Sequence, residues 1–168
     1  MTRPNTHNTN KAQPAQHKEG PGVRIPPPAY FAIALLAGWA LQAFLPLPWV
    51  ARPIARSFGG ALLVAGLMII VTGILAMAHG RGTLSTNGPS EALVTAGPYR
   101  FSRNPLYLGL VLLYSGVACL FAIVWAMPLL IPLVVFTQMA VIAPEERYLE
   151  RAFGEAYVSY RARVRRWL

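Results

Sequence analysis

The sequence predicts an all-α, polytopic integral membrane protein, a bundle of four transmembrane helices followed by a C-terminal amphipathic helix on the cytoplasmic side. Three observations lead to this fold class. Of the 168 residues, 55% are hydrophobic and only 12% are charged, a balance too apolar for an ordinary soluble domain. The apolar residues gather in three long blocks. The basic residues lie mainly in the segments before, between and after these blocks.

The N-terminal residues and the first two apolar blocks give the beginning of the bundle. Residues 1–28 lack apolar periodicity and end in three prolines, so we expect a disordered cytoplasmic tail with a stiff polyproline end. Residues 29–168 then form a single domain. Spans are expected at about 29–50 and 58–79, because each block approaches the ~20 apolar residues that cross a bilayer.

The last apolar block, residues 106–143, is too long for a single crossing. Its 38 uncharged residues would form a helix of roughly 57 Å, whereas the hydrocarbon core is about 30 Å thick. A proline at 128, close to Trp125, favours a break there because proline removes a helical hydrogen bond. We therefore predict two spans, at about 106–125 and 127–143, joined as a tight hairpin.

The basic residues predict how the four spans are oriented. The N-terminal tail, the loop 80–105 and the residues after 143 would share one side, and 13 of the 15 lysines and arginines lie there. Only Arg52 and Arg56 fall on the opposite side. The positive-inside rule therefore places both termini in the cytoplasm. Anionic membrane lipids account for the net charge of +9, so no nucleic acid is expected as a partner.

Glycines and metal ligands give two further expectations. Gly59, Gly66, Gly73 and Gly80 recur every seven residues in the second span, a stripe that allows a neighbouring helix to approach closely. Cys119 is the single cysteine and the three histidines are scattered. No metal-ligand spacing appears, and no metal site is predicted.

Two polar segments flank the last pair of spans. One is GPYRFSRNPLYLG at 97–109, and the other begins with Glu145 and Glu146, where the fourth span ends. Carboxylates at this depth are costly unless they are solvated or paired. Two interpretations are open: the glutamates pair with arginines of the loop or the C-terminal residues, or they bind a cationic or hydroxyl-rich ligand. Apolar residues spaced by three and four then predict a basic amphipathic helix over 145–168.

In their order and spacing these segments resemble the isoprenylcysteine carboxyl methyltransferase and phospholipid methyltransferase superfamily. The resemblance covers roughly residues 79–168 and rests on segment 97–109, the glutamate pair, Phe153–Gly154, Tyr157 and Tyr160. It implies an integral membrane enzyme that uses S-adenosylmethionine as its cofactor. It also implies that the pre-span loop, the glutamate pair and the C-terminal helix hold that cofactor.

The resemblance further implies a set of site residues. The expected cofactor-binding residues are Gly97, Tyr99, Arg103, Asn104, Pro105, Tyr107, Gly109, Glu145, Glu146, Tyr157 and Tyr160. The candidate catalytic residues are Arg103, Tyr107 and Glu146. Many members have histidine where this chain has Asn104. An amide can hydrogen-bond a cofactor but cannot take up a proton at neutral pH, so only a binding role carries over.

The implied reaction is methyl transfer to a carboxylate, as in a prenylated cysteine, or to another oxygen, nitrogen or sulfur of a small or lipid-like acceptor. Such a transfer requires the acceptor atom to be held about 3–3.5 Å from the methyl carbon. A carboxylate needs no general base, whereas an amine or a thiol must lose a proton. Two alternatives stay open from the sequence: an NADPH-dependent membrane sterol-type reductase, and a small non-enzymatic membrane accessory protein.

Overall fold

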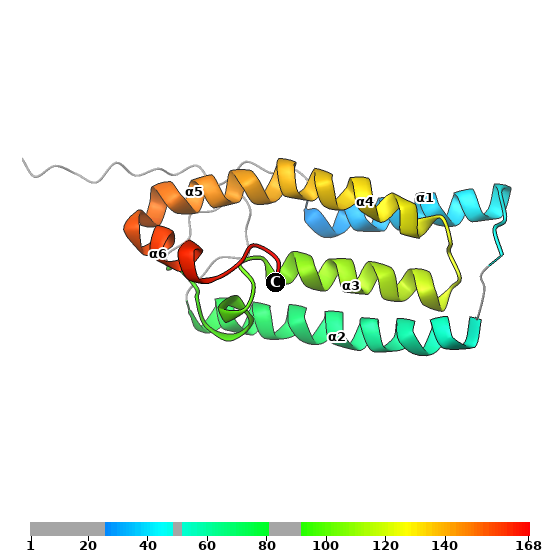
Figure 1. Ribbon diagram of the computed structural model, residues 1–168, viewed down its shortest axis with the longest axis horizontal. Helices are drawn as coiled ribbons and strands as arrows, with labels where there is room; N and C mark the ends of the chain where they lie inside the picture. The colour runs from blue at the N-terminus through cyan, green and yellow to red at the C-terminus, as the bar shows by residue number, and fades with distance from the viewer. Residues whose placement is uncertain (1–25, 49–51, 81–91) are drawn as a thin grey trace, which may run out of the picture.

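The computed structural model describes residues 26–48, 52–80 and 92–168, and the secondary structure within these ranges is entirely helical. The predicted N-terminal tail and much of the loop 80–105 lie outside the described residues. Four helices run side by side along the length of the molecule (Figure 1). They are α1 (Pro27–Phe44), α2 (Arg52–His79), α3 (Pro105–Leu120) and α4 (Ala126–Thr137). α2 packs against α3, and α1 packs against α4.

Within the described ranges, three helices are long and apolar enough to cross a membrane: Pro27–Phe44, Pro53–His79 and Ala126–Phe153. The third predicted span is shorter than expected, because α3 contains only 16 residues. It ends at Leu120, and the turn that follows uses a positive φ of 56° at Ala122. The predicted helical hairpin is confirmed, but the break precedes Ala126. Pro128 lies in the first turn of α4, where a missing N–H costs little.

α2 and α3 meet along a seam of glycines, which confirms the close approach expected from the glycine stripe. A Cβ added at Gly66 would lie 2.8 Å from the carbonyl oxygen of Gly109, and one at Gly116 would lie 2.8 Å from that of Gly59. Real side chains do not tolerate such distances, so glycine is required on both helices. At Gly60, the neighbour of Gly59, an added Cβ would have nothing within 4 Å.

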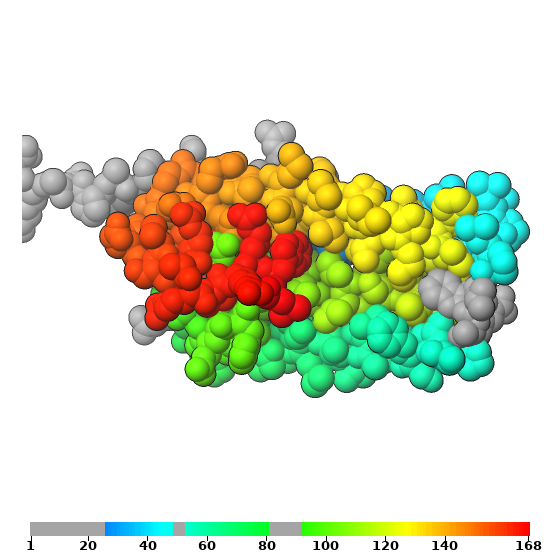
Figure 2. All heavy atoms as spheres, in the orientation of Figure 1, coloured from blue at the N-terminus to red at the C-terminus, as the bar shows by residue number. Residues whose placement is uncertain are grey.

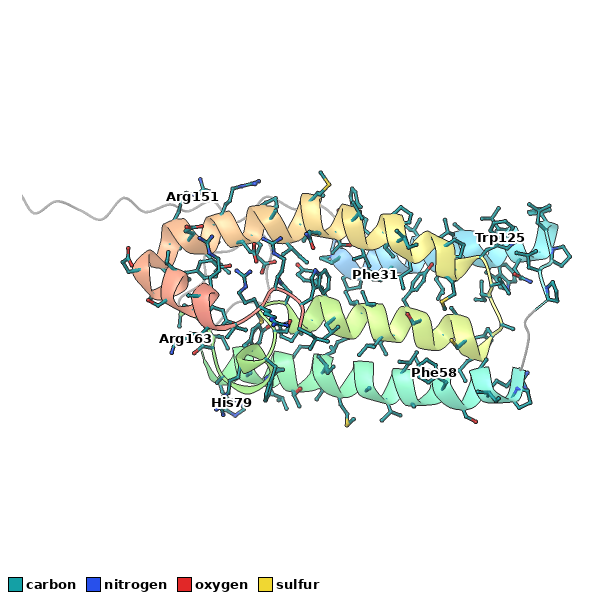
Figure 3. All side chains as sticks on the ribbon, viewed as in Figure 1. Phe31, Phe58, His79, Trp125, Arg151 and Arg163 are labelled. Atoms are coloured by element: carbon teal, nitrogen blue, oxygen red, sulfur yellow. The ribbon has the colours of Figure 1, made fainter. Side chains whose placement is uncertain are left out.

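Two side chains form hydrogen bonds at the end of the bundle where α1 ends and α4 begins. The indole Nε1 of Trp125 donates to the carbonyl of Leu45 at 2.8 Å, next to α1 in Figure 3. The hydroxyl of Tyr114, on α3, donates to the carbonyl of Ala126 at 2.8 Å. Phe31 packs edge-on against the ring of Tyr114, which joins α1 to the same group. These contacts fix the hairpin between α3 and α4 against α1.

α4 does not stop at the end of the predicted span. It passes through a π-helical turn, η2 (Gln138–Ile142), directly into α5 (Ala143–Phe153). In η2 the N–H of Ala143 donates to the carbonyl of Gln138, five residues earlier. Pro144 follows immediately and has no N–H to donate, so the helical hydrogen-bond ladder is interrupted at this point.

The prediction of one amphipathic helix over 145–168 is wrong. α5 ends at Phe153, Gly154 takes a φ of 50°, and a separate helix, α6 (Glu155–Arg163), folds back towards the loop before α3. Val164 is extended, with a φ of −121°. The last residues, Val164–Leu168, hereafter the C-terminal segment, run back to the start of α3 (Figure 1). The left-handed φ at 154 is readily adopted only by glycine, so the chain turns there.

Candidate functional site

Most of the predicted site residues lie at the end of the bundle where α5 and α6 meet the loop before α3. The loop contains a short 3-10 helix, η1 (Gly97–Arg100), followed by residues 101–104 and the first turn of α3. In Figure 2 the C-terminal segment (red) lies across this loop (green) and beside α5 (orange). Segments from four parts of the chain therefore converge here.

Glu146 is the centre of an ionic cluster. Its carboxylate contacts Arg103 through Nη1 and Oε1 at 3.1 Å. It also accepts two hydrogen bonds from Arg166, from Nη2 to Oε2 at 2.6 Å and from Nε to Oε1 at 3.1 Å. Glu146 is only 7% exposed. Two guanidinium groups therefore compensate the negative charge of one buried carboxylate. Pairing with arginines of the loop and the C-terminal residues is thus confirmed for Glu146.

Glu145 has a different environment from its neighbour. The hydroxyl of Tyr107, in the first turn of α3, donates to Oε2 of Glu145 at 3.0 Å. Tyr107 is buried, whereas Glu145 retains accessible surface. No salt bridge to Glu145 occurs among the described residues. The two adjacent glutamates are therefore held by unlike groups, one by arginines and one by a tyrosine.

Three buried tyrosines surround the cluster. The hydroxyl of Tyr160 donates to the carbonyl of Tyr99 at 2.7 Å, which joins α6 to η1. The hydroxyl of Tyr157 accepts a hydrogen bond from Nη1 of Arg103 at 3.5 Å. Burial raises the pKa of Tyr160 to about 12, and burial also raises the pKa values of Tyr99 and Tyr157. All three hydroxyls consequently remain protonated at neutral pH.

Asn104 connects the loop to the C-terminal segment. Its Nδ2 donates to the carbonyl of Arg166 at 3.1 Å, and the hydroxyl of Ser102 donates to the same oxygen at 3.3 Å. The N–H of Arg103 donates to the carbonyl of Arg165 at 3.0 Å. The Asn104 side chain is buried and is engaged by the protein's own backbone. Asparagine suits this position because its side-chain amide can donate to the carbonyl of Arg166.

Three of the predicted cofactor-binding residues shape the backbone instead of presenting a side chain to the cluster. Gly97 has a φ of 59° at the start of η1 and is exposed. Pro105 is buried at the first position of α3, where its fixed φ suits a helix start. Gly109 faces α2, since a Cβ there would lie 2.5 Å from Cγ1 of Ile70. The structure does not bring Gly109 to the glutamates.

Three further residues, Arg166, Ser102 and Trp167, belong to the site but were not among its predicted residues. Trp167 donates from Nε1 to Oε1 of Gln138 at 2.8 Å and packs against the buried cluster that contains Tyr107. Arg166 belongs to an arginine-rich run that is also typical of contact with lipid headgroups. Arg151 and Arg163 do point away from the bundle, as Figure 3 shows.

Two buried polar atoms of the site have no hydrogen-bond partner in the described part of the chain. They are the hydroxyl of Tyr99 and Nε of Arg103. A buried donor without a partner costs about 1–3 kcal/mol, so natural proteins rarely leave one unused. Both atoms belong to residues that flank the glutamate pair, and a polar ligand at this position would satisfy them.

Comparison with known proteins identifies the family. Residues 54–156 match the phospholipid methyltransferase family, from the start of α2 into α6. No curated protein matches the chain. This family and the isoprenylcysteine carboxyl methyltransferases form one superfamily of membrane methyltransferases that use S-adenosylmethionine. The match decides for a methyltransferase over the reductase and the accessory protein. The chain belongs to the phospholipid methyltransferase family and is an integral membrane, S-adenosylmethionine-dependent enzyme.

Proposed function

We propose that the protein transfers a methyl group from S-adenosylmethionine to the amine headgroup of a phospholipid-type acceptor at the cytoplasmic face of the membrane. The observation that carries this proposal is the convergence of the Tyr107–Glu145 pair and the Arg103–Glu146 pair at one end of the helical bundle. This end also holds the two buried donors without partners. The family match supplies the class of reaction.

The residues at this end have the chemistry that the cofactor requires. Carboxylates of Glu145 and Glu146 can accept hydrogen bonds from an ammonium group or from ribose hydroxyls. Arg103, through its unpaired Nε, can bind a carboxylate. Tyr99 and Tyr157 have the aromatic rings that pack well on adenine, although both rings are buried in the cofactor-free protein. We therefore assign the cofactor site to these residues, together with Tyr107 and Tyr160.

The proposed catalytic role of Glu145 is to accept a proton. S-adenosylmethionine supplies an electrophilic methyl group when it is bound. An amine that is protonated at neutral pH has no lone pair to accept this methyl group, so its proton must first leave. Glu145 retains accessible surface, and Tyr107 fixes its Oε2, so its Oε1 is the atom assigned to take the proton. Arg103 and Glu146 keep the loop and α5 together around it.

A labelling experiment tests the acceptor. Purified protein should bind S-adenosylmethionine and transfer labelled methyl groups to a phospholipid with a primary amine headgroup, in preference to prenylcysteine analogues and small thiols. Glu145→Gln should reduce kcat by roughly 10²- to 10⁴-fold, the usual contribution of a general base. Because glutamine keeps one acceptor oxygen at this position of the cofactor site, binding of S-adenosylmethionine should be weakened much less than kcat. Transfer to a prenylcysteine carboxylate that is insensitive to this substitution would replace the amine acceptor. Absence of cofactor binding would refute the assignment of the site.

We further propose that α3 is a fourth span and that both termini are cytoplasmic. α3 runs antiparallel to α2 in Figure 1, and it has 16 residues where α2 has 28. Its 16 residues extend about 24 Å, which a bilayer can match by thinning slightly. This arrangement puts the glutamate pair and the C-terminal segment on the side from which a soluble cofactor arrives.

Single cysteines should reveal this orientation. In a Cys119→Ala background, Arg100→Cys should react with a membrane-impermeant maleimide only from the cytoplasmic side, and Leu47→Cys only from the opposite side. Both positions are exposed in the structure. Reaction of both cysteines from the same side would contradict the four-span topology.

A further inference from the structure

The carboxylate of Glu146 is nearly saturated by the protein itself. A carboxylate has about four acceptor positions. Three contacts are already made, one from Arg103 and two from Arg166. The site proposed above needs a carboxylate for the positively charged or hydroxyl groups of the cofactor. Glu145 is the proposed proton acceptor, so this role is assigned to Glu146, and one of the two arginines occupies a position that the cofactor requires.

The two arginines differ in how firmly they are held. The side chain of Arg103 is 9% exposed, lies between α3 and α6, and also donates to Tyr157. The side chain of Arg166 is 37% exposed, and Glu146 is the one acceptor that its guanidinium has within the described residues. Removing Arg166 from Glu146 returns its guanidinium to water at small cost, whereas removing Arg103 would leave a charge buried. Arg166 is thus the partner that can leave.

We propose that Arg166 is an internal cation that occupies Glu146 in the cofactor-free protein and is displaced when S-adenosylmethionine binds. This inference rests on the cofactor site proposed above. S-adenosylmethionine carries an ammonium, a sulfonium and a carboxylate group. The carboxylate is assigned above to Arg103, so it is the ammonium that approaches Glu146, where two guanidinium groups already lie. Like charges at close range repel, and displacement of Arg166 removes that repulsion. Arg166 therefore lowers the affinity for the cofactor.

Displacement of Arg166 also affects its neighbour in the chain. Trp167 donates a hydrogen bond to Gln138 in η2 and packs against the buried cluster of Tyr107, Val141 and Ile142. When the side chain of residue 166 leaves Glu146, the indole of residue 167 loses one of the attachments that hold it in place. Trp167 consequently reports on the position of the C-terminal segment, independently of any methyl transfer.

Calorimetric titration with S-adenosylmethionine, carried out on the full chain, tests the proposal. Arg166→Gln should lower the Kd roughly three- to ten-fold, which corresponds to loss of one competing, partly exposed ion pair. Arg165→Gln is the matched control, because it removes one neighbouring positive charge from an exposed side chain that makes no contact with Glu146 in the described part of the chain. Its Kd should equal that of the natural protein. Subtracting the emission spectrum of Trp167→Phe from that of the natural protein isolates the fluorescence of Trp167. Its emission maximum should move to longer wavelength as cofactor is added, because the indole becomes more exposed to water.

The possible outcomes separate this inference from the function on which it rests. If the natural protein and Arg166→Gln both fail to bind S-adenosylmethionine, the cofactor site itself is wrong. If the natural protein binds and Arg166→Gln binds more weakly or equally, the site stands and competition by Arg166 is refuted. Weaker binding would make Arg166 a direct ligand of the cofactor. An equal gain in Arg165→Gln would attribute the effect to net charge and would also refute the proposal.

Discussion

Replacing Glu146 by alanine is expected to abolish binding of S-adenosylmethionine and to destabilise the folded protein. The substitution leaves Arg103 buried without its carboxylate and releases the C-terminal segment from α5. Loss of one partner of a buried ion pair costs about 3–5 kcal/mol. Since Arg166 is partly exposed and regains water, we expect a value near the lower end. Thermal unfolding in detergent and calorimetric titration would measure the two effects.

Glu150→Ala is the appropriate control for this experiment. Glu150 lies one helical turn beyond Glu146 on α5 and pairs with Arg161 at 2.8 Å, but both side chains are substantially exposed. An exposed pair contributes about 0–1 kcal/mol, so the melting temperature should hardly change. Cofactor binding should also be preserved. Equal losses of stability in the two variants would show that burial of Glu146 has no energetic consequence.

Gly66→Ala is expected to destabilise the bundle by about 1–3 kcal/mol, although it adds a single methyl group. The new Cβ would lie 2.8 Å from the carbonyl oxygen of Gly109 and 3.0 Å from the amide nitrogen of Leu113. Both are backbone atoms and cannot rotate away, so α2 and α3 must separate. Because α3 carries Tyr107, cofactor affinity should fall as well. Unfolding in detergent and titration with S-adenosylmethionine would measure both.

The same helix offers a control for the alanine substitution. Gly60 has no atom within 4 Å of an added Cβ, so Gly60→Ala should leave stability unchanged or raise it slightly through the better helix propensity of alanine. A Gly66→Ala variant as stable as Gly60→Ala would mean that α2 and α3 adjust freely, and that the glycine seam does not set their spacing.

Local signals predicted the parts of the fold that depend on neighbouring residues. The seven-residue glycine period predicted the α2–α3 contact, because residues at that spacing share one helix face. The excess length of block 106–143 predicted the hairpin, since no bilayer accommodates such a helix. The resemblance selected Arg103, Tyr107 and Glu146, which the structure brings to one end of the bundle. Their binding and catalytic roles remain predictions.

Features that depend on the path of the chain could not be predicted in the same way. The apolar period of three and four residues continues across Gly154, so periodicity alone gave one helix where the structure has two. With a straight helix over 145–168, Arg166 would project far from Glu146. The pairing exists because the chain turns at Gly154 and is extended after Val164. Nothing in the local sequence separates this arginine from Arg163 or Arg165.

The π-helical turn η2 has a consequence for where the glutamates point. An α-helix advances about 100° per residue, so one additional residue in a turn rotates everything beyond it by that angle. α4 and α5 form one continuous rod, yet they are out of phase with each other at Gln138–Ile142. The first half of the rod, α4, can therefore pack its apolar stripe on α1. The second half, α5, aims its carboxylates at the start of α3, the loop before it and the C-terminal segment. One continuous helical segment can thus face α1 along α4 and face the site along α5, with no loop between the two helices.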